Sequence, residues 1–396
     1  MKRPNLYILL LFFLLLLPFG QTTANGNDSI RLSLLTCAPG EEIYSLFGHT
    51  AIRYEDPANG IDAVFNYGLF SFNTPNFIFR FSLGETDYQL GATDYAHFAA
   101  EYAFDGRSVW QQTLNLSKEE KAELIRLLQE NYRPENRVYR YNFFYDNCAT
   151  RPRDKIEESI IGKVIYPSEP QDGSRSFRDI VHQYCKGHPW ARFGLDLCIG
   201  SEADRPITQR QMMFAPFYLM DAFAGAQIAN DSIQRPLVSD KALIVDAVSD
   251  EEEGGWMPTP LQCSLLLFIL TAAATIYSLR KRTGLWGVDL VLFGTAGIVG
   301  CVLAFLALFS EHPAVSSNFL LLVFHPGQFL FLPYIIYCVR KGKKCWYLTL
   351  NLIVLTLFIA LFPLIPQRFD FAVVPLALCL LIRSASNLIL TYKKAK

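Results

Sequence analysis

Two short segments of the sequence hold residues whose types suit covalent catalysis. His49 follows a glycine and begins a strand-like run, and Cys148 follows Asp146 and Asn147 at the start of a helix-like run. A thiol and an imidazole can perform acyl transfer, because the imidazole removes a proton first from the thiol and later from the acceptor. Asp and Asn are good helix caps, so we expect Cys148 in the first helical turn, where the helix dipole favours a thiolate near neutral pH. The alternative is a packed structural cysteine and a strand-end histidine without a catalytic role.

A third residue should orient the imidazole of His49. Asn66 is our prediction because it lies on the next expected strand, and Asp62 is the competing candidate. The sequence contains neither a C-x-x-C pair nor an H-x-x-x-H pair, so we expect no metal centre and no cofactor. The predicted site therefore consists of a nucleophile, a base and an orienting amide.

The elements that must position these residues follow from the sequence pattern. Apolar alternation with β-branched and aromatic content predicts strands at residues 30–37, 49–54, 64–68 and 109–116. Helices are expected at residues 148–160, 176–184 and 209–223, and a further helix begins at the capping box Ser117-Lys-Glu-Glu120. The expected fold class of this segment is α+β.

Residues 1–24 are predicted to be a signal peptide. Lys2 and Arg3 precede an apolar run at residues 6–20, which is shorter than the roughly 20 residues that a spanning helix needs. A retained anchor is the alternative. Export would place the next segment in an oxidising compartment, where Cys185 and Cys198 could form a disulfide.

The rest of the chain divides into a mixed, polar segment at residues 25–258 and an apolar segment at residues 259–396. An acidic, glycine- and proline-rich stretch at residues 250–260 has the composition of a linker between them. The net charge of -1 gives no reason to expect a nucleic acid as a partner.

The apolar segment is predicted to span a membrane. Its five apolar stretches are residues 261–279, 285–309, 319–339, 346–365 and 371–390. Basic residues cluster after the first and third stretches and at the C-terminus, and basic loops stay in the cytoplasm. This pattern places residues 25–258 outside the cytoplasm and the C-terminus inside it, in agreement with a signal peptide.

The third stretch is the least regular of the five. It contains prolines, so it could be a buried core helix instead of a membrane span. It also contains His325 and Gln328. These two residues either line a site for a lipid or substrate, or they satisfy backbone groups that a helix kink sets free.

Four further residues are candidates for substrate binding. Asn147 and Arg151 flank Cys148 in the sequence. His312 and Asn318 lie in a loop that the charge pattern places on the same side as residues 25–258.

Taken together, these residues resemble the Lnb-type lipoprotein N-acyltransferases of bacteria. The likeness covers nearly the whole chain after the signal peptide, and it rests on residues 34–40 (LLTCAPG), 47–53 (FGHTAIR), 65–68 (FNYG), 134–137 (PENR), 141–151 (YNFFYDNCATR) and 311–316 (EHPAVS). A strand histidine ahead of an Asn-Cys motif also resembles the circularly permuted papain-like fold of the lecithin:retinol acyltransferase group. The oxyanion glutamine of papain has no counterpart near Cys148, so the oxyanion hole stays unassigned.

The resemblance implies a reaction and a location. Cys148 would attack an ester of a membrane phospholipid, which gives a thioester and a lysophospholipid. The free amine of the lipid-bearing cysteine of a diacylated lipoprotein would then take the acyl chain. The resemblance also implies a bacterial inner-membrane protein whose catalytic domain is periplasmic.

Two other functions remain open at this point. The same residues would serve a periplasmic cysteine peptidase or amidase acting on peptidoglycan or a peptide, although five spans are more than a tether needs. A membrane sensor or assembly protein without enzymatic activity would make Cys148 dispensable.

Overall fold

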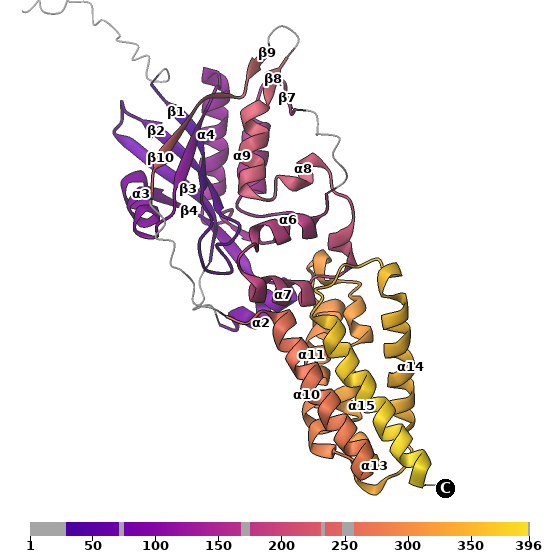
Figure 1. Ribbon diagram of the computed structural model, residues 1–396. Coiled ribbons are helices and arrows are strands. Elements are labelled where there is room, and N and C mark those ends of the chain that lie inside the picture. Colours follow the sequence, from indigo (N-terminus) through magenta and orange to yellow (C-terminus); the bar gives the residue numbers. More distant parts are fainter. Residues whose placement is uncertain (1–28, 71–74, 168–174, 231–233, 248–256, 395–396) are drawn as a thin grey trace, which may run out of the picture.

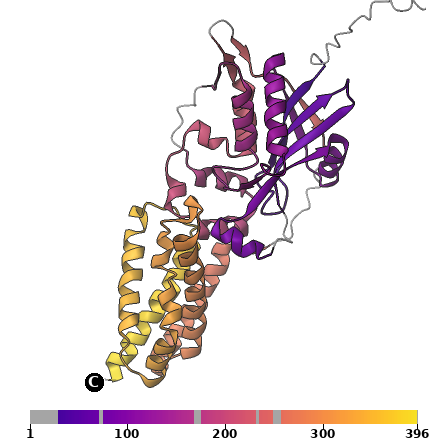
Figure 2. The same ribbon diagram turned by 180° about the vertical axis from the view of Figure 1, so that it is seen from behind.

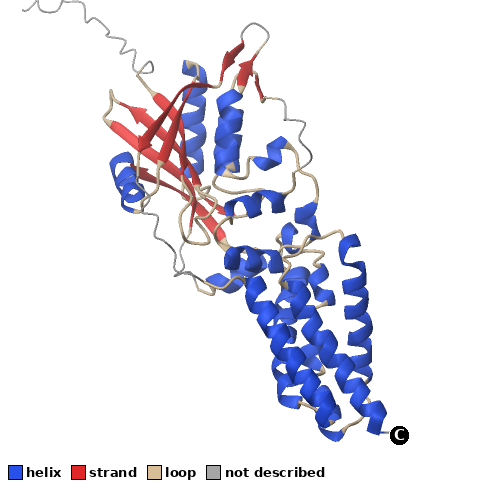
Figure 3. Cartoon of the chain, in the orientation of Figure 1, coloured by secondary structure: helices blue, strands red, loops and turns tan. Residues whose placement is uncertain are grey.

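The computed structural model describes residues 29–70, 75–167, 175–230, 234–247 and 257–394. The predicted signal peptide and most of the predicted linker lie outside these residues. A sheet-rich domain comes first, and an elongated helical bundle extends from one end of it (Figure 1, Figure 3). The prediction of an α+β domain followed by an all-α apolar domain is therefore confirmed.

The first domain is built on a seven-stranded antiparallel sheet with the strand order β10-β5-β1-β2-β3-β4-β6. Its strands are β1 Arg31–Cys37, β2 His49–Asp56, β3 Ile61–Leu69, β4 Asp87–Asp94, β5 Val109–Leu114, β6 Val138–Arg140 and β10 Val238–Val245. A smaller sheet contains β7 Lys163–Ile165, β8 Gln227–Ala229 and β9 Gln234–Pro236. The sequence pattern predicted β1, β2, β3 and β5, and it did not predict the other strands.

Helices cover both faces of the large sheet. Those of the first domain are α2 Phe77–Leu83, α3 Tyr95–Phe104, α4 Lys118–Tyr132, α5 Thr150–Ser159, α6 Phe177–Tyr184, α7 Pro189–Cys198, α8 Gln209–Met212 and α9 Pro216–Gly225. The predicted capping box at the start of α4 is confirmed, since Ser117 and Glu120 cap each other's backbone N–H groups. Helix α3 lies on the opposite side of the sheet from α4 and α9 (Figure 2).

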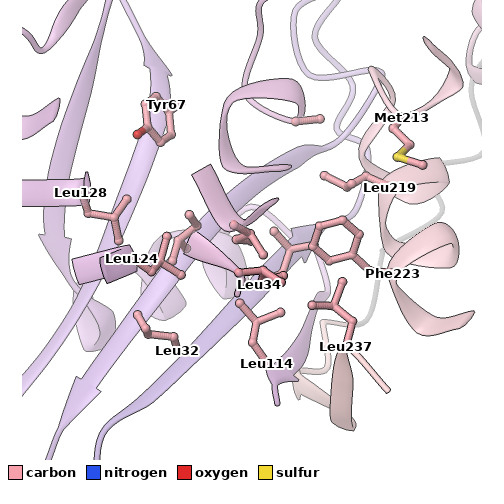
Figure 4. Packing of buried hydrophobic residues seen from close by; sticks show 14 of the residues in the cluster. Leu32, Leu34, Tyr67, Leu114, Leu124, Leu128, Met213, Leu219, Phe223 and Leu237 are labelled. Carbon is pink, nitrogen blue, oxygen red and sulfur yellow. The ribbon is translucent and has the colours of Figure 1, made fainter. Parts of the chain in front are cut away.

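The main core lies between the sheet and α4, α5 and α9. Leu32 and Leu34 of β1 pack there with Leu124 of α4 and Phe223 of α9 (Figure 4). The alternate β1 residues face α3 instead, and Leu35 belongs to the core on that side. Because both faces of β1 are covered, the central strand is buried over nearly its whole length. The sheet therefore gives a fixed frame for the ends of its strands.

The helical bundle differs from the prediction at one segment. Among the described residues, four helices are long and apolar enough to cross a membrane. They are α10 Pro260–Lys281, α11 Trp286–Phe309, α14 Trp346–Leu361 with its short extension Phe362–Leu364, and α15 Val373–Lys394. The predicted third span is broken into η4 Phe319–Leu322, α12 Pro326–Leu330 and α13 Leu332–Lys341. The five apolar segments of the prediction are all helical, but the third is interrupted, because proline cannot continue the helical hydrogen-bond ladder.

The interrupted segment packs closely on α11. A Cβ added to Gly300 of α11 would lie 2.5 Å from the backbone nitrogen of His325, so only glycine permits this approach. At the break, Gln328 Nε2 donates a hydrogen bond to the carbonyl oxygen of Val323 at 2.7 Å. This contact agrees with the interpretation of Gln328 as a residue that satisfies freed backbone groups.

The two domains are joined by specific contacts as well as by the chain. Arg368, in the loop before α15, forms ion pairs with Asp179 at the start of α6 and with Asp204. Asn318 Nδ2 donates to the carbonyl oxygen of Leu197 at 2.7 Å, and Gln367 Nε2 donates to that of Ile199 at 3.1 Å. These contacts hold the outer end of the bundle against α6 and α7.

A buried ion pair connects three of the spanning helices. Arg383 of α15 and Asp289 of α11 are both fully buried and are joined by a 2.7 Å contact, and Thr275 of α10 accepts a hydrogen bond from Arg383. Asn387 Nδ2 also donates to Asp289 at 2.9 Å. The pair therefore fixes how α10, α11 and α15 pack.

Replacing Asp289 with alanine is expected to destabilise the bundle by about 3–5 kcal/mol, because it leaves the buried Arg383 guanidinium without a counter-charge. The free energy of unfolding of the purified protein in detergent measures this effect. The double variant Asp289→Leu with Arg383→Met is expected to lose much less, since no unpaired charge remains. Equal losses in the two variants would contradict the assignment.

Candidate active site

His49 is placed by a tight turn at the end of the sheet. It is the first residue of β2 and pairs in register with Cys37, the last residue of β1. The preceding Gly48 has φ +77, and a Cβ at this position would lie 2.5 Å from the carbonyl oxygen of Cys37. Only glycine fits this turn without strain. The glycine-histidine pair of the sequence therefore sets the imidazole at the strand end.

Asn66, the predicted third residue, lies within hydrogen-bond distance of the imidazole. His49 Nε2 and Asn66 Oδ1 are 3.1 Å apart. Because the amide oxygen only accepts hydrogen bonds, this contact assigns the ring proton to Nε2 and leaves the Nδ1 lone pair free. The competing candidate, Asp62, instead forms a two-point contact with Arg53, at 2.8 and 2.6 Å. The structure thus brings together His49 and Asn66, and it places Asp62 elsewhere.

The environment of His49 favours the neutral base. Burial lowers the pKa of His49 to about 4, although the hydrogen bond to Asn66 acts in the opposite direction. At neutral pH the imidazole is therefore unprotonated and able to accept a proton. Part of the side chain still reaches the surface.

Cys148 lies in the turn that leads into α5. The helix is assigned from Thr150, but the N–H of Arg151 already donates to the carbonyl oxygen of Asn147. Asn147 Oδ1 accepts from the N–H groups of Ala149 and Thr150, at 2.8 and 2.9 Å. Asn147 is thus the residue whose side chain caps this turn, and Cys148 follows it directly, close to the expected position.

The thiol of Cys148 lies beside the strand ends that carry the other two residues. The backbone N–H of Thr50, the residue after His49, lies close enough to the Cys148 sulfur to lower the pKa of the thiol, as does the N–H of Cys148 itself. A Cβ added to Gly68 of β3 would lie 3.5 Å from Cys148 Cβ. Cys148 is half-buried, whereas Cys37, opposite His49, has no exposed surface. Cys148 is therefore the thiol at this strand end that a substrate can reach.

The ionisation state of Cys148 differs from the expectation. Burial raises the pKa of the thiol to about 11, although two backbone N–H groups act to lower it. The predicted thiolate near neutral pH is therefore wrong for the resting protein. The desolvation cost of the charged sulfur exceeds the gain from the helix start. The thiol therefore rests protonated, and any reaction through its sulfur would need a base to remove the proton.

Three tyrosines near the thiol would sense its charge. Burial raises the pKa of Tyr88, Tyr139 and Tyr141, and an ionised Cys148 would raise each of them further. The hydroxyl of Tyr139 lies 3.9 Å from the position that a Cβ on Gly68 would occupy. It is buried and has no hydrogen-bond partner among the described residues. An unpaired buried donor next to a nucleophile is free to bind an oxygen of the substrate.

The structure gives the other predicted site residues different surroundings. Arg151 forms a two-point ion pair with Asp146 and stacks over the Tyr139 ring at 3.5 Å. Asn147 is buried, and its Nδ2 donates to the carbonyl oxygens of Phe143 and Phe214. Both residues hold the turn, and we assign them to positioning.

The two loop residues lie at the junction with the bundle. His312 Nε2 donates to the carbonyl oxygen of Phe81 in α2 at 3.1 Å, and burial lowers its pKa. Asn318 is buried at the contact with α7. Within the described part of the chain, neither side chain is hydrogen-bonded to the segment that carries Cys148, so the structure does not bring them to the thiol. Cys185 and Cys198 are both free thiols, and the possible disulfide between them is not formed.

Some residues of the site could not be identified from the sequence. Tyr88 and Tyr139 face each other across β4 and β6, two strands that the pattern did not predict. Tyr141 lies within the segment that carries Cys148, but a tyrosine there has many structural explanations. Only the glycine of the FNYG segment, Gly68 with φ +94, gave a local signal for a close approach at this point.

The comparisons with known proteins agree with this arrangement. Residues 21–172 match the family model of the Lnb N-terminal periplasmic domain, and residues 251–395 match that of the Lnb transmembrane domain. No curated protein and no solved structure has significant similarity to the chain. The permuted papain-like fold therefore stays a prediction. The first match contains His49, Asn66 and Cys148, and the second contains the four spanning helices. The chain thus belongs to the Lnb family, as a multi-pass inner-membrane protein with a periplasmic N-terminal domain.

Proposed function

We propose that the protein is a lipoprotein N-acyltransferase that uses a membrane phospholipid as the acyl donor and a diacylated lipoprotein as the acceptor. The observation that carries the proposal is the oriented, neutral imidazole of His49 at the strand end where the reachable thiol of Cys148 lies. This strand end is also close to the membrane domain. Arg140, between Tyr139 and Tyr141, pairs at 3.4 Å with Glu311 in the loop after α11.

The first half-reaction transfers the acyl chain to the enzyme. His49 Nδ1 takes the proton of the Cys148 thiol while the sulfur attacks the ester carbonyl carbon, and a C–S bond forms. Collapse of the tetrahedral intermediate breaks the ester C–O bond. The imidazolium returns its proton to the leaving alcohol, so the products are an acyl thioester and a lysophospholipid.

The second half-reaction transfers the chain to the acceptor. The neutral α-amine of the lipid-bearing cysteine attacks the thioester carbonyl, and His49 removes one of its protons. The C–S bond then breaks, and the sulfur regains a proton from the imidazolium. The product is an amide-linked third acyl chain on the lipoprotein.

Tyr139 is the best candidate for stabilising the developing oxyanion, because its buried hydroxyl lies beside Cys148 without another partner. Replacing Tyr139 with phenylalanine is expected to slow acylation of Cys148 by about 10²-fold, since one oxyanion donor is lost. Single-turnover kinetics with labelled phospholipid measure this step. Tyr67→Phe is the matched control, because the Tyr67 hydroxyl already donates to Asn131 at 2.9 Å. An unchanged rate in Tyr139→Phe would exclude this role.

The topology supports both substrates. The basic residues at the ends of α10 and α13 lie at the end of the bundle away from the sheet domain, as does the end of α15 (Figure 1). A cytoplasmic C-terminus follows from the positive-inside rule. Phospholipid and lipoprotein would then both lie in the leaflet next to the catalytic domain, which raises their effective concentration.

The test uses the full-length protein in proteoliposomes with acyl-labelled phospholipid. The proposal expects a hydroxylamine-sensitive acyl adduct on Cys148, which disappears when a diacylated lipoprotein with a free N-terminus is added. Mass analysis should then find the label as an N-acyl group on the lipoprotein. An adduct that is discharged only to water would favour a hydrolase. The absence of an adduct, together with full complementation by Cys148→Ala, would exclude both enzymatic functions.

A further inference from the structure

We propose that α2 and a row of aromatic side chains behind it form the path by which an acyl chain of a membrane phospholipid leaves the bilayer and reaches Cys148. The proposal rests on the acyltransferase function and adds to it the part of the molecule that takes up the donor. It starts from α2, a short helix that the function described above does not use.

Helix α2 exposes large apolar side chains that have no cover in the protein. None of its residues is buried, and Ile78, Phe79 and Phe81 are 78%, 57% and 43% exposed. A short helix with such a surface belongs next to another apolar phase, because water would have to order around it. Its one basic residue, Arg80, pairs with Asp87 and donates to the carbonyl oxygen of Glu85, which leaves the helix with no unpaired charge.

The position of α2 identifies that phase as the lipid bilayer. The ring of Phe79 lies 5.7 Å from that of Phe305 in α11, and Phe305 lies 5.6 Å from Phe309 at the outer end of the same helix. Leu308 and Phe309 are 75% and 64% exposed, so the apolar surface of the spanning helix continues into that of α2.

Two hydrogen bonds hold α2 beside the outer end of α11. The N–H of Glu311 donates to the carbonyl oxygen of Leu83 at 2.8 Å, and His312 Nε2 donates to that of Phe81 at 3.1 Å. Both donors belong to the loop that follows α11. The helix is therefore held at the boundary between the membrane domain and the sheet domain (Figure 1).

Aromatic rings continue from α2 to the active site. Phe81 lies 6.2 Å from Phe77, Phe77 stacks on Phe70 at 5.5 Å, and Phe70 lies 5.1 Å from Tyr88. The last contact is the stack of Tyr88 on Tyr141, at 4.1 Å.

This row of aromatic rings offers apolar contacts to an acyl chain from α2 to the active site. Tyr88 pairs in register with Tyr139, and a Cβ on Gly68 would lie 3.9 Å from the Tyr139 hydroxyl and 3.5 Å from Cys148 Cβ, so the row leads to the strand end that carries the thiol. An extended hydrocarbon chain is the ligand that such a row suits, because rings offer dispersion contacts without polar groups to be desolvated. A peptide would leave its backbone groups unpaired along the same row.

The experiment compares two acyl donors in full-length protein in proteoliposomes. The variant carries Ile78→Ser and Phe79→Ser, and the matched control carries Phe104→Ser in α3, a residue that is 92% exposed. One donor is acyl-labelled phospholipid in the bilayer, and the other is a water-soluble short-chain thioester. We expect the ratio of the phospholipid rate to the thioester rate to fall by about tenfold or more in the α2 variant, and to stay unchanged in the control.

Three other outcomes would each contradict one part of the proposal. An unchanged ratio in the α2 variant would overturn the acyl path and leave the acyltransferase function intact. Normal adduct formation with slower transfer to the lipoprotein would overturn it in favour of an acceptor-binding surface. Failure of the unaltered protein to form any adduct with phospholipid would overturn the function itself.

A second measurement tests the placement of α2 without using activity. Phe79→Trp is expected to add fluorescence that brominated phospholipids quench, beyond the quenching of the parent protein, whereas Phe104→Trp should add fluorescence that they do not quench. Equal quenching of the two added tryptophans would overturn the contact of α2 with lipid, whatever the enzymatic result.

Discussion

Replacing Cys148 with alanine is expected to abolish the acyl adduct and to lower N-acylation of lipoprotein by about 10⁴-fold or more, because no other group in the site can form the covalent intermediate. The reason is steric as well as chemical. Cys37, opposite His49, is fully buried and cannot replace Cys148. Intact-mass analysis of the protein after incubation with phospholipid detects the adduct directly.

The control for this prediction is Cys198→Ala. Cys198 is a half-buried free thiol at the end of α7, and its backbone carbonyl accepts a hydrogen bond from Asn318. This variant should keep the adduct and the transfer activity. Adduct formation in Cys148→Ala, or its loss in Cys198→Ala, would place the nucleophile elsewhere.

Replacing His49 with alanine is expected to change the pH dependence of Cys148 reactivity as well as its rate. With the base present, the alkylation rate should vary little above the His49 pKa of about 4 and fall below it, where the imidazole becomes protonated. Without the base, reaction requires the free thiolate. With a thiol pKa of about 11, only about one thiol in 10⁴ is ionised at pH 7, and the rate should rise about tenfold per pH unit above that.

Iodoacetamide alkylation of Cys148, followed by mass spectrometry across a pH series, separates the two profiles. His97→Ala is the matched control, since His97 is an exposed residue of α3. The control should reproduce the flat profile of the unaltered protein. A flat profile in His49→Ala would show that His49 does not act as the base.

The sequence pattern predicted the apolar strands β1, β2, β3 and β5, and the strands it missed include both edge strands of the large sheet. Strand β1 alternates between two covered faces, and its apolar residues identify it. Strand β10, at one edge, is mostly exposed and carries Asp240 and Lys241, so it lacks an apolar period. Strand β6 at the other edge has only three residues. Both strands are defined by backbone pairing with a neighbouring strand. The sequence does not show this pairing.

The site was predicted to the extent that its residues carry local signals. A histidine after a glycine and a cysteine after an Asn cap are visible within a few residues. The ionisation of Cys148 was predicted wrongly, because the helix start is a local feature whereas burial depends on the packing of Tyr88, Tyr139 and Tyr141 around the sulfur. Long-range packing decided the balance between these two effects.

The interrupted third segment of the bundle shows the same difference between local sequence signals and long-range packing. Pro326 and Pro333 signalled an irregular helix, but the length of the apolar run outweighed them in the prediction. The close approach of His325 to Gly300 of α11 determines where the chain turns. The sequence does not show which segment packs against a glycine in an apolar helix.

The protonated state of the resting thiol also bears on how long the protein survives in its compartment. Peroxides and small disulfides react with the thiolate, and an ionised cysteine in the periplasm would be consumed by oxidation to a sulfenic acid or a mixed disulfide. Burial keeps the Cys148 sulfur protonated. In the proposed mechanism, nucleophilic character then arises only while a substrate fills the site and His49 accepts the proton. The desolvation that lowers the reactivity of the resting thiol would therefore also protect it from oxidation between turnovers.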